Sequence, residues 1–360
     1  MTYTTSGRAR AAYHGARVTG GEMRFELKPI HDQVMVITGA SSGIGLATAQ
    51  MAAALGARVV LVSRDEVDLQ SAVERIGGAG GQAISVAADV ADAEAMKRVA
   101  TTAIREFGTI DTWVNNAGVS IYGRIEAVGL MDARRLFETN YWGVVHGTLA
   151  ALPHLKARGG ALINVGSVLS DTGYPLQGHY TASKHAVKGF TDSLRLELEA
   201  SGAPISVTLI QPAAIDTPYP EHAKSYLGVE PTHMPPVYAP EVVARAILDS
   251  AQRPRRTVLV GGGAKLFTAV ERYTPRLGDK VKEATAIQGQ RTDRPVRLPD
   301  TLFGPRSGDA RVRGHYGGHV MESSAYTGLR LNRQRALLGL AAVGAAVALL
   351  DRVGVFGHGD

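Results

Sequence analysis

Two side chains in the second half of the chain have the types and the spacing that acid–base catalysis requires. Tyr180 and Lys184 are four residues apart in a segment with helical periodicity, so both should lie on one helix face. A phenol with a pKa of about 10 is a poor acid or base at neutral pH, but a nearby fixed cation lowers that pKa. The pair predicts a tyrosine that transfers a proton. Because the same spacing also occurs by chance on surface helices, the pair alone does not assign an activity.

Ser167 is placed to assist such a tyrosine. It ends the predicted strand 161–167, and the ligands of open α/β sheets bind at the carboxyl ends of the strands. Its hydroxyl could therefore hold a carbonyl oxygen beside the phenol. Ser170, three residues later, is a rival for the same role.

A glycine-rich turn near the start of the chain has the pattern of a phosphate-binding site. The apolar run 34–37 predicts a buried strand, and helical periodicity resumes at Leu46. Between them, Gly39 permits a tight turn, Gly43 lets the backbone approach a pyrophosphate, and Gly45 lets the helix pack close to the strand. The N–H groups at the helix N-terminus favour an anion. Structural turns of this kind are common, so this signal is weak without support from elsewhere in the chain.

Hydrophobic patterning predicts the elements that must position these groups. Near-continuous aliphatic runs alternate with segments of helical periodicity, as expected for strands covered on both faces. The long predicted helices cover about 132–157 and 178–201, and the predicted strands are 34–37, 57–63, 83–90, 110–118, 161–167, 204–211 and 257–260. With right-handed crossovers, this order predicts an α/β fold, a Rossmann-type doubly wound parallel sheet of about seven strands with helices on both faces.

Composition divides the 360 residues into four parts. We expect a disordered leader over 1–29, a catalytic domain over 30–265, a basic and poorly structured extension over 266–335, and a short apolar helix over 336–356. Met23 is a second candidate for the start of translation. The chain has no Cys, which excludes disulfides and cysteine-ligated metals and favours a cytoplasmic setting. The extension is rich in arginine but lacks interleaved aromatic residues, so no nucleic-acid partner is predicted.

The apolar stretch 336–350 predicts a helix that must bury all of its faces. Its fifteen residues span about 22 Å, less than a bilayer core of about 30 Å. Arg330, Arg333 and Arg335 precede it and favour docking on an anionic membrane surface, which would make the protein peripheral to a membrane. Packing against another helix in an oligomer, or burial within the same subunit, are the alternatives.

Taken together, the motifs closely resemble the short-chain dehydrogenase/reductase superfamily over about residues 30–265. They occur in the family's order and spacing: Thr38-Gly39-x3-Gly43-Ile44-Gly45, Asp89, Asn115-Asn116-Ala117-Gly118, Asn140, Ser167, Tyr180-x3-Lys184 and Pro212-x4-Thr217. Ser167 precedes Tyr180 by 13 residues, the spacing that the family favours, which supports it over Ser170. In one departure from the family pattern, Ala213 replaces the glycine that usually follows Pro212.

The resemblance implies a role for each of these residues. Tyr180 would transfer the proton, Ser167 would orient the substrate oxygen, and Lys184 would lower the pKa of Tyr180 and bind the nicotinamide ribose. Asn140 would hold a water in a proton relay. Asn115 would help to flank the adenosine ribose and stabilise the sheet. The implied cofactor-binding residues are Gly39, Ser41, Ser42, Gly43, Ile44, Gly45, Ser63, Arg64, Asp89, Val90, Asn116, Ala117, Gly118, Tyr180, Lys184, Pro212, Ile215 and Thr217.

The end of the second predicted strand favours NADP(H) over NAD(H). An NAD site places an acid there to bind the ribose 2′-OH, whereas this chain has Ser63 and Arg64. Ser63 does not repel a 2′-phosphate, and the guanidinium of Arg64 could bind one with two hydrogen bonds. Asp65 is an unfavourable neighbour for a phosphate, although it lies beyond the end of the strand. The alternative is that Arg64 is a solvated loop residue.

The substrate pocket is expected to be apolar and aromatic. The segments around the motifs supply Val119, Ile121, Tyr122, Tyr174, Leu176 and Gln177. The proline-rich loop 218–240 reads as an ordered lid and carries Tyr219, His222, Tyr226, His233, Met234 and Tyr238. This composition suits a mid-sized lipophilic carbonyl or alcohol. His222 and His233 could instead belong to the plain surface of the lid.

The leading hypothesis from the sequence is an NADP(H)-dependent oxidoreductase with a small-molecule carbonyl or alcohol substrate and no metal. The alternatives are a non-catalytic cofactor-binding regulatory or scaffold protein on the same fold, and an isomerase or dehydratase on a related scaffold. The resemblance also implies a homodimer or homotetramer formed through the helices 132–157 and 178–201.

Overall fold

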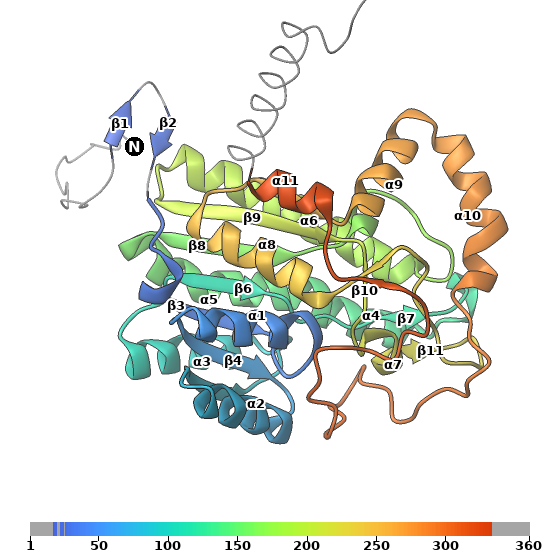
Figure 1. Cartoon of the computed structure of the whole chain (residues 1–360), viewed down its shortest axis with the longest axis horizontal. Helices are drawn as coiled ribbons and strands as arrows, with labels where there is room; N and C mark the ends of the chain where they lie inside the picture. The colour runs from blue at the N-terminus through green and yellow to red at the C-terminus, as the bar shows by residue number, and fades with distance from the viewer. Residues whose placement is uncertain (1–16, 20–21, 25, 333–360) are drawn as a thin grey trace, which may run out of the picture.

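Seven short aliphatic runs form the parallel sheet at the centre of the molecule. The computed structural model describes residues 17–19, 22–24 and 26–332. The strands stand in the order β13-β9-β8-β6-β3-β4-β5, and every neighbouring pair is parallel. The fold is therefore the predicted Rossmann-type doubly wound α/β sheet (Figure 1). The strand bounds are β3 (Val34–Thr38), β4 (Arg58–Ser63), β5 (Gln82–Ala87), β6 (Thr112–Asn115), β8 (Gly160–Val165), β9 (Ile205–Pro212) and β13 (Thr257–Val260).

Helices cover both faces of this sheet and bury two apolar cores. One core packs α1 (Gly43–Ala54), α2 (Glu66–Gly78) and α8 (Pro240–Gln252) against the sheet, and the other packs α3 (Ala93–Phe107), α5 (Gly143–Arg158) and α6 (Gly178–Ala200). Successive strand residues such as Val36 and Ile37 belong to opposite cores, and both are fully buried. This explains why the strands are apolar throughout instead of alternating with polar residues.

The chain reverses its direction of winding between β3 and β6. The neighbours of β3 are β4 on one side and β6 on the other, so the connections after these strands diverge. Divergent crossovers leave a crevice at the carboxyl ends of the two strands, and this is where open α/β sheets bind ligands. Both the glycine turn after β3 and the Asn-Asn-Ala-Gly turn after β6 open into this crevice.

The loop 218–240, expected as an ordered lid, is held by short strands and begins with one turn of helix, α7 (Tyr219–His222). β11 (Lys224–Ser225) pairs with β7 (Ile121–Tyr122). β12 (Val237–Tyr238) lies between β10 (Ala214–Ile215) and β14 (Val320–Met321).

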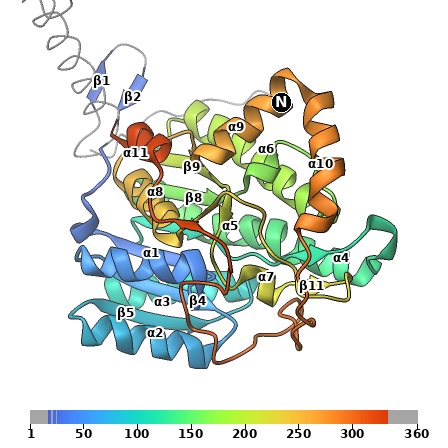
Figure 2. The same cartoon turned by 45° about the vertical axis from the view of Figure 1, so that its right-hand side comes forward.

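The segment after residue 262 differs from the expectation of a poorly structured extension. It contains α9 (Gly262–Tyr273), α10 (Pro275–Gly289) and α11 (Ala325–Leu331), and the chain between α10 and α11 crosses the carboxyl end of the sheet (Figure 2). Several of its arginines pair with acids from distant parts of the chain, for example Arg297 with Glu221 and Glu230. The local composition indicates solvated arginines, because the acids that pair with them lie far away in the sequence.

The structure describes only part of the two segments that the sequence predicts at the ends of the chain. Within the expected leader 1–29, β1 (Arg17–Thr19) and β2 (Glu22–Arg24) form an antiparallel pair. The predicted apolar helix 336–356 lies outside the described residues, so its docking on a membrane stays a prediction. Within 26–332, no helix is long and apolar enough to cross a membrane.

Exposed apolar side chains lie on the helices predicted to form an oligomer. They belong to α4 (Leu130–Phe137), to α5 and α6, and to the π-helical turn Glu138–Trp142 that joins α4 to α5. These side chains are Leu130, Met131, Trp142, Leu149 and Leu196. Such a surface is compatible with a homodimer or homotetramer, and the oligomeric state stays a prediction.

Candidate active site

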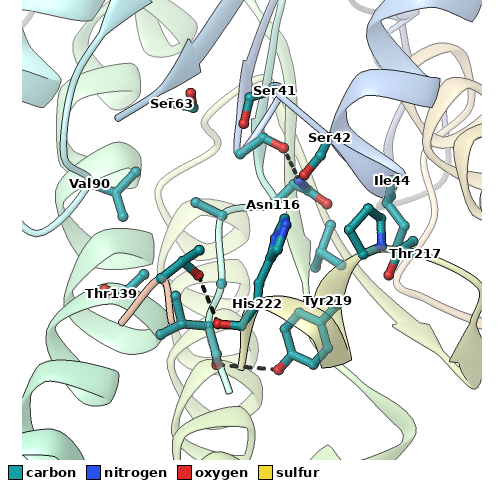
Figure 3. A pocket seen from close by; sticks show the side chains of 18 of the residues that line it. Ser41, Ser42, Ile44, Ser63, Val90, Asn116, Thr139, Thr217, Tyr219 and His222 are labelled. Carbon is teal, nitrogen blue, oxygen red and sulfur yellow. Dashed lines mark hydrogen bonds between the residues drawn. The ribbon is translucent and has the colours of Figure 1, made fainter. Parts of the chain in front are cut away.

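A cavity of about 260 Å³ lies at the carboxyl edge of the sheet, where the sequence motifs converge (Figure 3). In Figure 3, Ser63 and Val90 lie on the side opposite Ile44 and Thr217. The structure brings together nearly all of the predicted site residues as lining groups. These are Gly39, Ser41, Ser42, Gly43, Ile44, Ser63, Arg64, Asp89, Val90, Asn116, Ala117, Gly118, Ser167, Tyr180, Lys184, Pro212, Ile215 and Thr217.

The glycine turn is shaped for close approach of a ligand backbone and of its own helix. Gly39 and Gly43 have φ angles of +65° and +55°, which favour glycine. A Cβ on Gly45 would lie 2.1 Å from the carbonyl oxygen of Gly39, so α1 can start here only with glycine. The amide of Asn116 donates to the carbonyls of Thr38 and Gly39 at 2.9 and 3.2 Å. This cradle fits the pyrophosphate of a dinucleotide.

Asn140 and Asn115 hold the site from behind without lining the cavity. Asn140 lies in the π-helical turn and is fully buried. Its amide oxygen accepts from the Val119 N–H at 2.8 Å, and its amide nitrogen donates to the Val119 carbonyl and to Ser183 at 3.0 and 3.1 Å. Asn115 donates to Asn164 at 2.9 Å and so joins β6 to β8. π-helical turns are frequent at functional sites, where they redirect a side chain.

Tyr180 and Lys184 share one face of α6, as predicted, and both are buried. The ammonium of Lys184 lies 5.8 Å from the centroid of the Tyr180 ring and donates to the Val165 carbonyl at 2.9 Å. Burial lowers the pKa of Lys184 to about 8. Burial also raises the pKa of Tyr180, while hydrogen bonds with Tyr219 and Ser167 oppose that rise. In contrast to the implied depression by Lys184, the pKa of Tyr180 therefore lies above its ordinary value.

The structure favours Ser167 over Ser170 beside this phenol. Ser167 lines the cavity together with Tyr180, and its hydroxyl accepts from the N–H of Leu169 at 3.1 Å. Ser170 lines neither this cavity nor a second one that adjoins it. Its hydroxyl is turned back to accept from the N–H of Ser167 at 3.2 Å. The two serines thus have different tasks: Ser170 fixes the turn that presents Ser167.

A second cavity of about 210 Å³ adjoins the first. Five residues line both: Ser167, Tyr180, Ala213, Tyr219 and His233. Among the residues that the structure describes, no Asp, Glu, Lys or Arg lines the second cavity. The predicted pocket residues Tyr122, Tyr174, Gln177 and Met234 lie in its wall, to which α9 adds Gly263, Ala264 and Phe267.

The remaining predicted pocket residues lie elsewhere. Val119 and His222 line the first cavity, whereas Ile121, Leu176, Tyr226 and Tyr238 line neither of the two. His222 and His233 each line a cavity, which differs from the alternative of a plain lid surface. The Nε2 atom of His233 is enclosed without a hydrogen-bond partner in the described chain, and burial lowers the pKa of this histidine to about 4. His233 is therefore neutral at physiological pH.

Some residues of the first cavity carry no motif and were not predicted. Thr301, Pro305 and Arg306 come from the segment after α10, and Asp68 comes from the first turn of α2. Arg135, also unpredicted, pairs with Asp89 at 2.5 Å behind the expected adenine site. No sequence signal marked these residues, since their contacts join parts of the chain that are far apart.

Comparison with known proteins now assigns the family. The family model for short chain dehydrogenase matches residues 33–226, more than half of the chain. The chain is a short-chain dehydrogenase/reductase. Its fold and its site are those of an oxidoreductase of this family, whose members act on small molecules and bind a nicotinamide cofactor.

Individual relatives agree with this assignment. An uncharacterised oxidoreductase of Bacillus subtilis, YxnA, is 46% identical over 309 residues, which cover 84% of this chain and 86% of the relative. Because 84% of this chain is more than residues 1–265 contain, the match must include part of the C-terminal segment.

Two solved structures are also similar. A short-chain dehydrogenase/reductase from Burkholderia phymatum in complex with NAD is 27% identical, with a TM-score of 0.62, over 76% of this chain and 100% of its own. An alcohol dehydrogenase from Thermococcus sibiricus complexed with 5-hydroxy-NADP is 25% identical, with a TM-score of 0.56, over 63% of this chain and 94% of its own.

The close packing of the glycine turn predicts that one added methyl group weakens cofactor binding by this short-chain dehydrogenase. Gly45→Ala should lose at least tenfold in affinity for NADPH and NADH, because the new Cβ forces the Gly39 carbonyl out of the cradle. Titration of cofactor fluorescence measures both dissociation constants. Gly78→Ala, where the added Cβ meets nothing within 4 Å, is the matched control and should bind like the wild type. Wild-type affinity in Gly45→Ala would contradict the assignment of the cradle.

Proposed function

We propose that this short-chain dehydrogenase is an NADP(H)-dependent oxidoreductase that interconverts a neutral, mid-sized lipophilic carbonyl compound and its alcohol. Tyr180 is the general acid–base. The observation that carries the proposal is the position of Tyr180 and Ser167, two residues with hydroxyl groups that line both cavities. A substrate oxygen placed between them would lie at the junction of the cofactor cleft and the apolar pocket.

The side chains of this junction can move one proton. NADP(H), when bound, supplies or accepts the hydride. In the reducing direction Tyr180, kept protonated by its raised pKa, donates its proton to the substrate oxygen, and Ser167 holds the same oxygen by a hydrogen bond. The buried ammonium of Lys184 lies close enough to stabilise the phenolate that forms. With a pKa of about 8, Lys184 is still largely protonated at pH 7.

The second cavity supports a neutral substrate. Within residues 26–332, no charged residue lines its wall that could pair with a carboxylate or a phosphate, and an unpaired buried charge is very unfavourable. The titratable groups in the wall are neutral as well: burial raises the pKa of Tyr122 well above its ordinary value and lowers that of His233 to about 4. Aromatic and methyl groups from Tyr174, Met234 and Phe267 supply an apolar surface.

The preference for NADP(H) rests on the end of β4. Ser63 and Arg64 line the first cavity there. The guanidinium of Arg64 donates to the carbonyls of Thr301 and Leu302 at 2.5 and 3.3 Å, and three of its five N–H groups remain for a 2′-phosphate. Asp65 also lines the cavity, but its carboxylate accepts from the Asp68 N–H and from the Ser307 hydroxyl.

Removal of the phenol hydroxyl tests the proposed chemistry. Tyr180→Phe should keep NADPH binding and lose roughly 10²–10⁴-fold in turnover, because only the acid–base group is removed. Turnover is followed by NADPH absorbance with a panel of neutral carbonyl compounds. Tyr273→Phe, which changes an exposed phenol on α9, is the control. Near-native turnover of Tyr180→Phe would contradict the assignment of Tyr180 as the general acid–base. A wild type that binds NADPH but reduces no compound of the panel would favour a non-catalytic scaffold.

Arg64 should set the choice of cofactor. Loss of its charge-assisted bonds to the 2′-phosphate should cost about 1.5–3 kcal/mol, or roughly 10–100-fold in NADPH affinity. We expect Arg64→Ala to weaken NADPH in this way and to spare NADH, as measured by fluorescence titration of both. Arg75→Ala on the exposed side of α2 is the matched control. An equal loss for both cofactors would show that Arg64 acts only by holding Thr301 and Leu302.

A further inference from the structure

The chain between α10 and α11 forms a strap over the cofactor cleft. We define the strap as residues 299–315. It starts beside the lid, where the N–H of Thr301 donates to the His222 carbonyl at 2.9 Å. The next residue, Leu302, is 1% exposed and packs in the same apolar cluster as Tyr180. The strap is thus anchored in the interior and does not lie loosely on the surface.

The strap is also fixed to the two elements that would hold a dinucleotide. At the first turn of α2, the buried carboxylate of Asp68 accepts from the N–H groups of Gly308 and Asp309 at 2.9 and 3.1 Å. At the glycine turn, the N–H of Gly43 donates to the carbonyl of Arg311 at 3.0 Å. The strap therefore bridges the adenosine side and the pyrophosphate side of the cleft.

Arg306 is the cation of the strap that lines the cavity. Its guanidinium donates to Asp309 at 2.6 Å and to the Glu221 carbonyl at 3.3 Å. Asp309 in turn accepts from His222 at 2.6 Å and from Arg311 at 2.5 Å. Asp309 and Arg311 connect Arg306 to the glycine turn, because the Arg311 carbonyl accepts from the N–H of Gly43. The head of Arg64 donates instead to the carbonyls of Thr301 and Leu302.

We propose that Arg306 is a cofactor-binding residue whose guanidinium binds the pyrophosphate, with the strap closed over it. This inference rests on the proposed function, namely that the cleft takes NADP(H). A guanidinium matches two phosphate oxygens with parallel hydrogen bonds, and two of its five donors are used within the strap and the lid. Asp309 does not cancel this charge, because Arg311 and His222 also hold its carboxylate and keep its pKa below the ordinary value.

The strap lies outside residues 33–226, the part that matches the short-chain dehydrogenase model. The common part of the family therefore does not supply Arg306. The match to the relative from Bacillus subtilis covers 84% of this chain and so extends beyond the part that the family model matches.

Affinities for the two cofactors test the role of Arg306. Arg306→Gln should weaken NADPH and NADH alike by about tenfold or more, because the pyrophosphate is common to both. The matched control is Arg294→Gln. Arg294 comes from the same segment and pairs with Glu230 at 2.9 Å, but it does not line the cavity. Its affinities should stay within about twofold of the wild type. Fluorescence titration gives all of these constants without requiring a substrate.

The outcomes separate this inference from the proposed function. Unchanged affinities in Arg306→Gln, with a wild type that binds both cofactors, would overturn the inference alone. A loss for NADPH only would place Arg306 at the 2′-phosphate and overturn its assignment to the pyrophosphate. A wild type that binds neither cofactor would overturn the proposed function and the inference with it.

Hydrogen exchange of the wild type tests the closure of the strap without any variant. Saturating NADPH should slow exchange of the backbone amides of 300–311, because a bound pyrophosphate ties the strap to the cleft through Arg306. Amides on the exposed side of α10 should be unaffected and serve as the internal control. Equal exchange of 300–311 with and without NADPH would show that the strap does not close over the cofactor.

Discussion

The site depends on the hydrogen-bonded seam between β3 and β6. The hydroxyl of Thr38 accepts from the N–H groups of Asn116 and Ala117 at 3.0 and 3.1 Å, and the Asn116 amide returns to the Thr38 carbonyl at 2.9 Å. The crossovers diverge at this seam, so every ligand-facing turn is placed relative to it. A slip by one residue here would separate the glycine turn from the half of the site that carries Tyr180.

On this frame the chemistry comes from a small number of buried groups. Burial keeps the phenol of Tyr180 protonated and holds a neutral wall around the apolar pocket. The charged groups are concentrated on the opposite side, at Arg64 and under the strap. The molecule thus separates a charged cleft, suited to a dinucleotide, from a neutral pocket, suited to a lipophilic substrate, and joins the two at one pair of hydroxyls.

The sheet and the first cavity could be predicted from the sequence, because short stretches of neighbouring residues determine both. Aliphatic runs mark strands, and glycines mark the turn at Gly39. The strap was not predictable in the same way. Arg306 and Arg311 read as solvated charge in a polar segment, since Glu221, which accepts hydrogen bonds from both, is 85 and 90 residues away from them. The pKa of Tyr180 was also out of reach, because it depends on burial by the folded chain.

The central claim is that this short-chain dehydrogenase reduces neutral carbonyl compounds in an uncharged pocket. The most direct measurement compares kcat/KM of the wild type, with NADPH, for matched ketones that differ only in a terminal methyl ester or a free carboxylate. The account predicts turnover of the ester and at least tenfold weaker turnover of the carboxylate, because none of the described residues that line the pocket pairs with the charge. Equal or faster turnover of the carboxylate would contradict it.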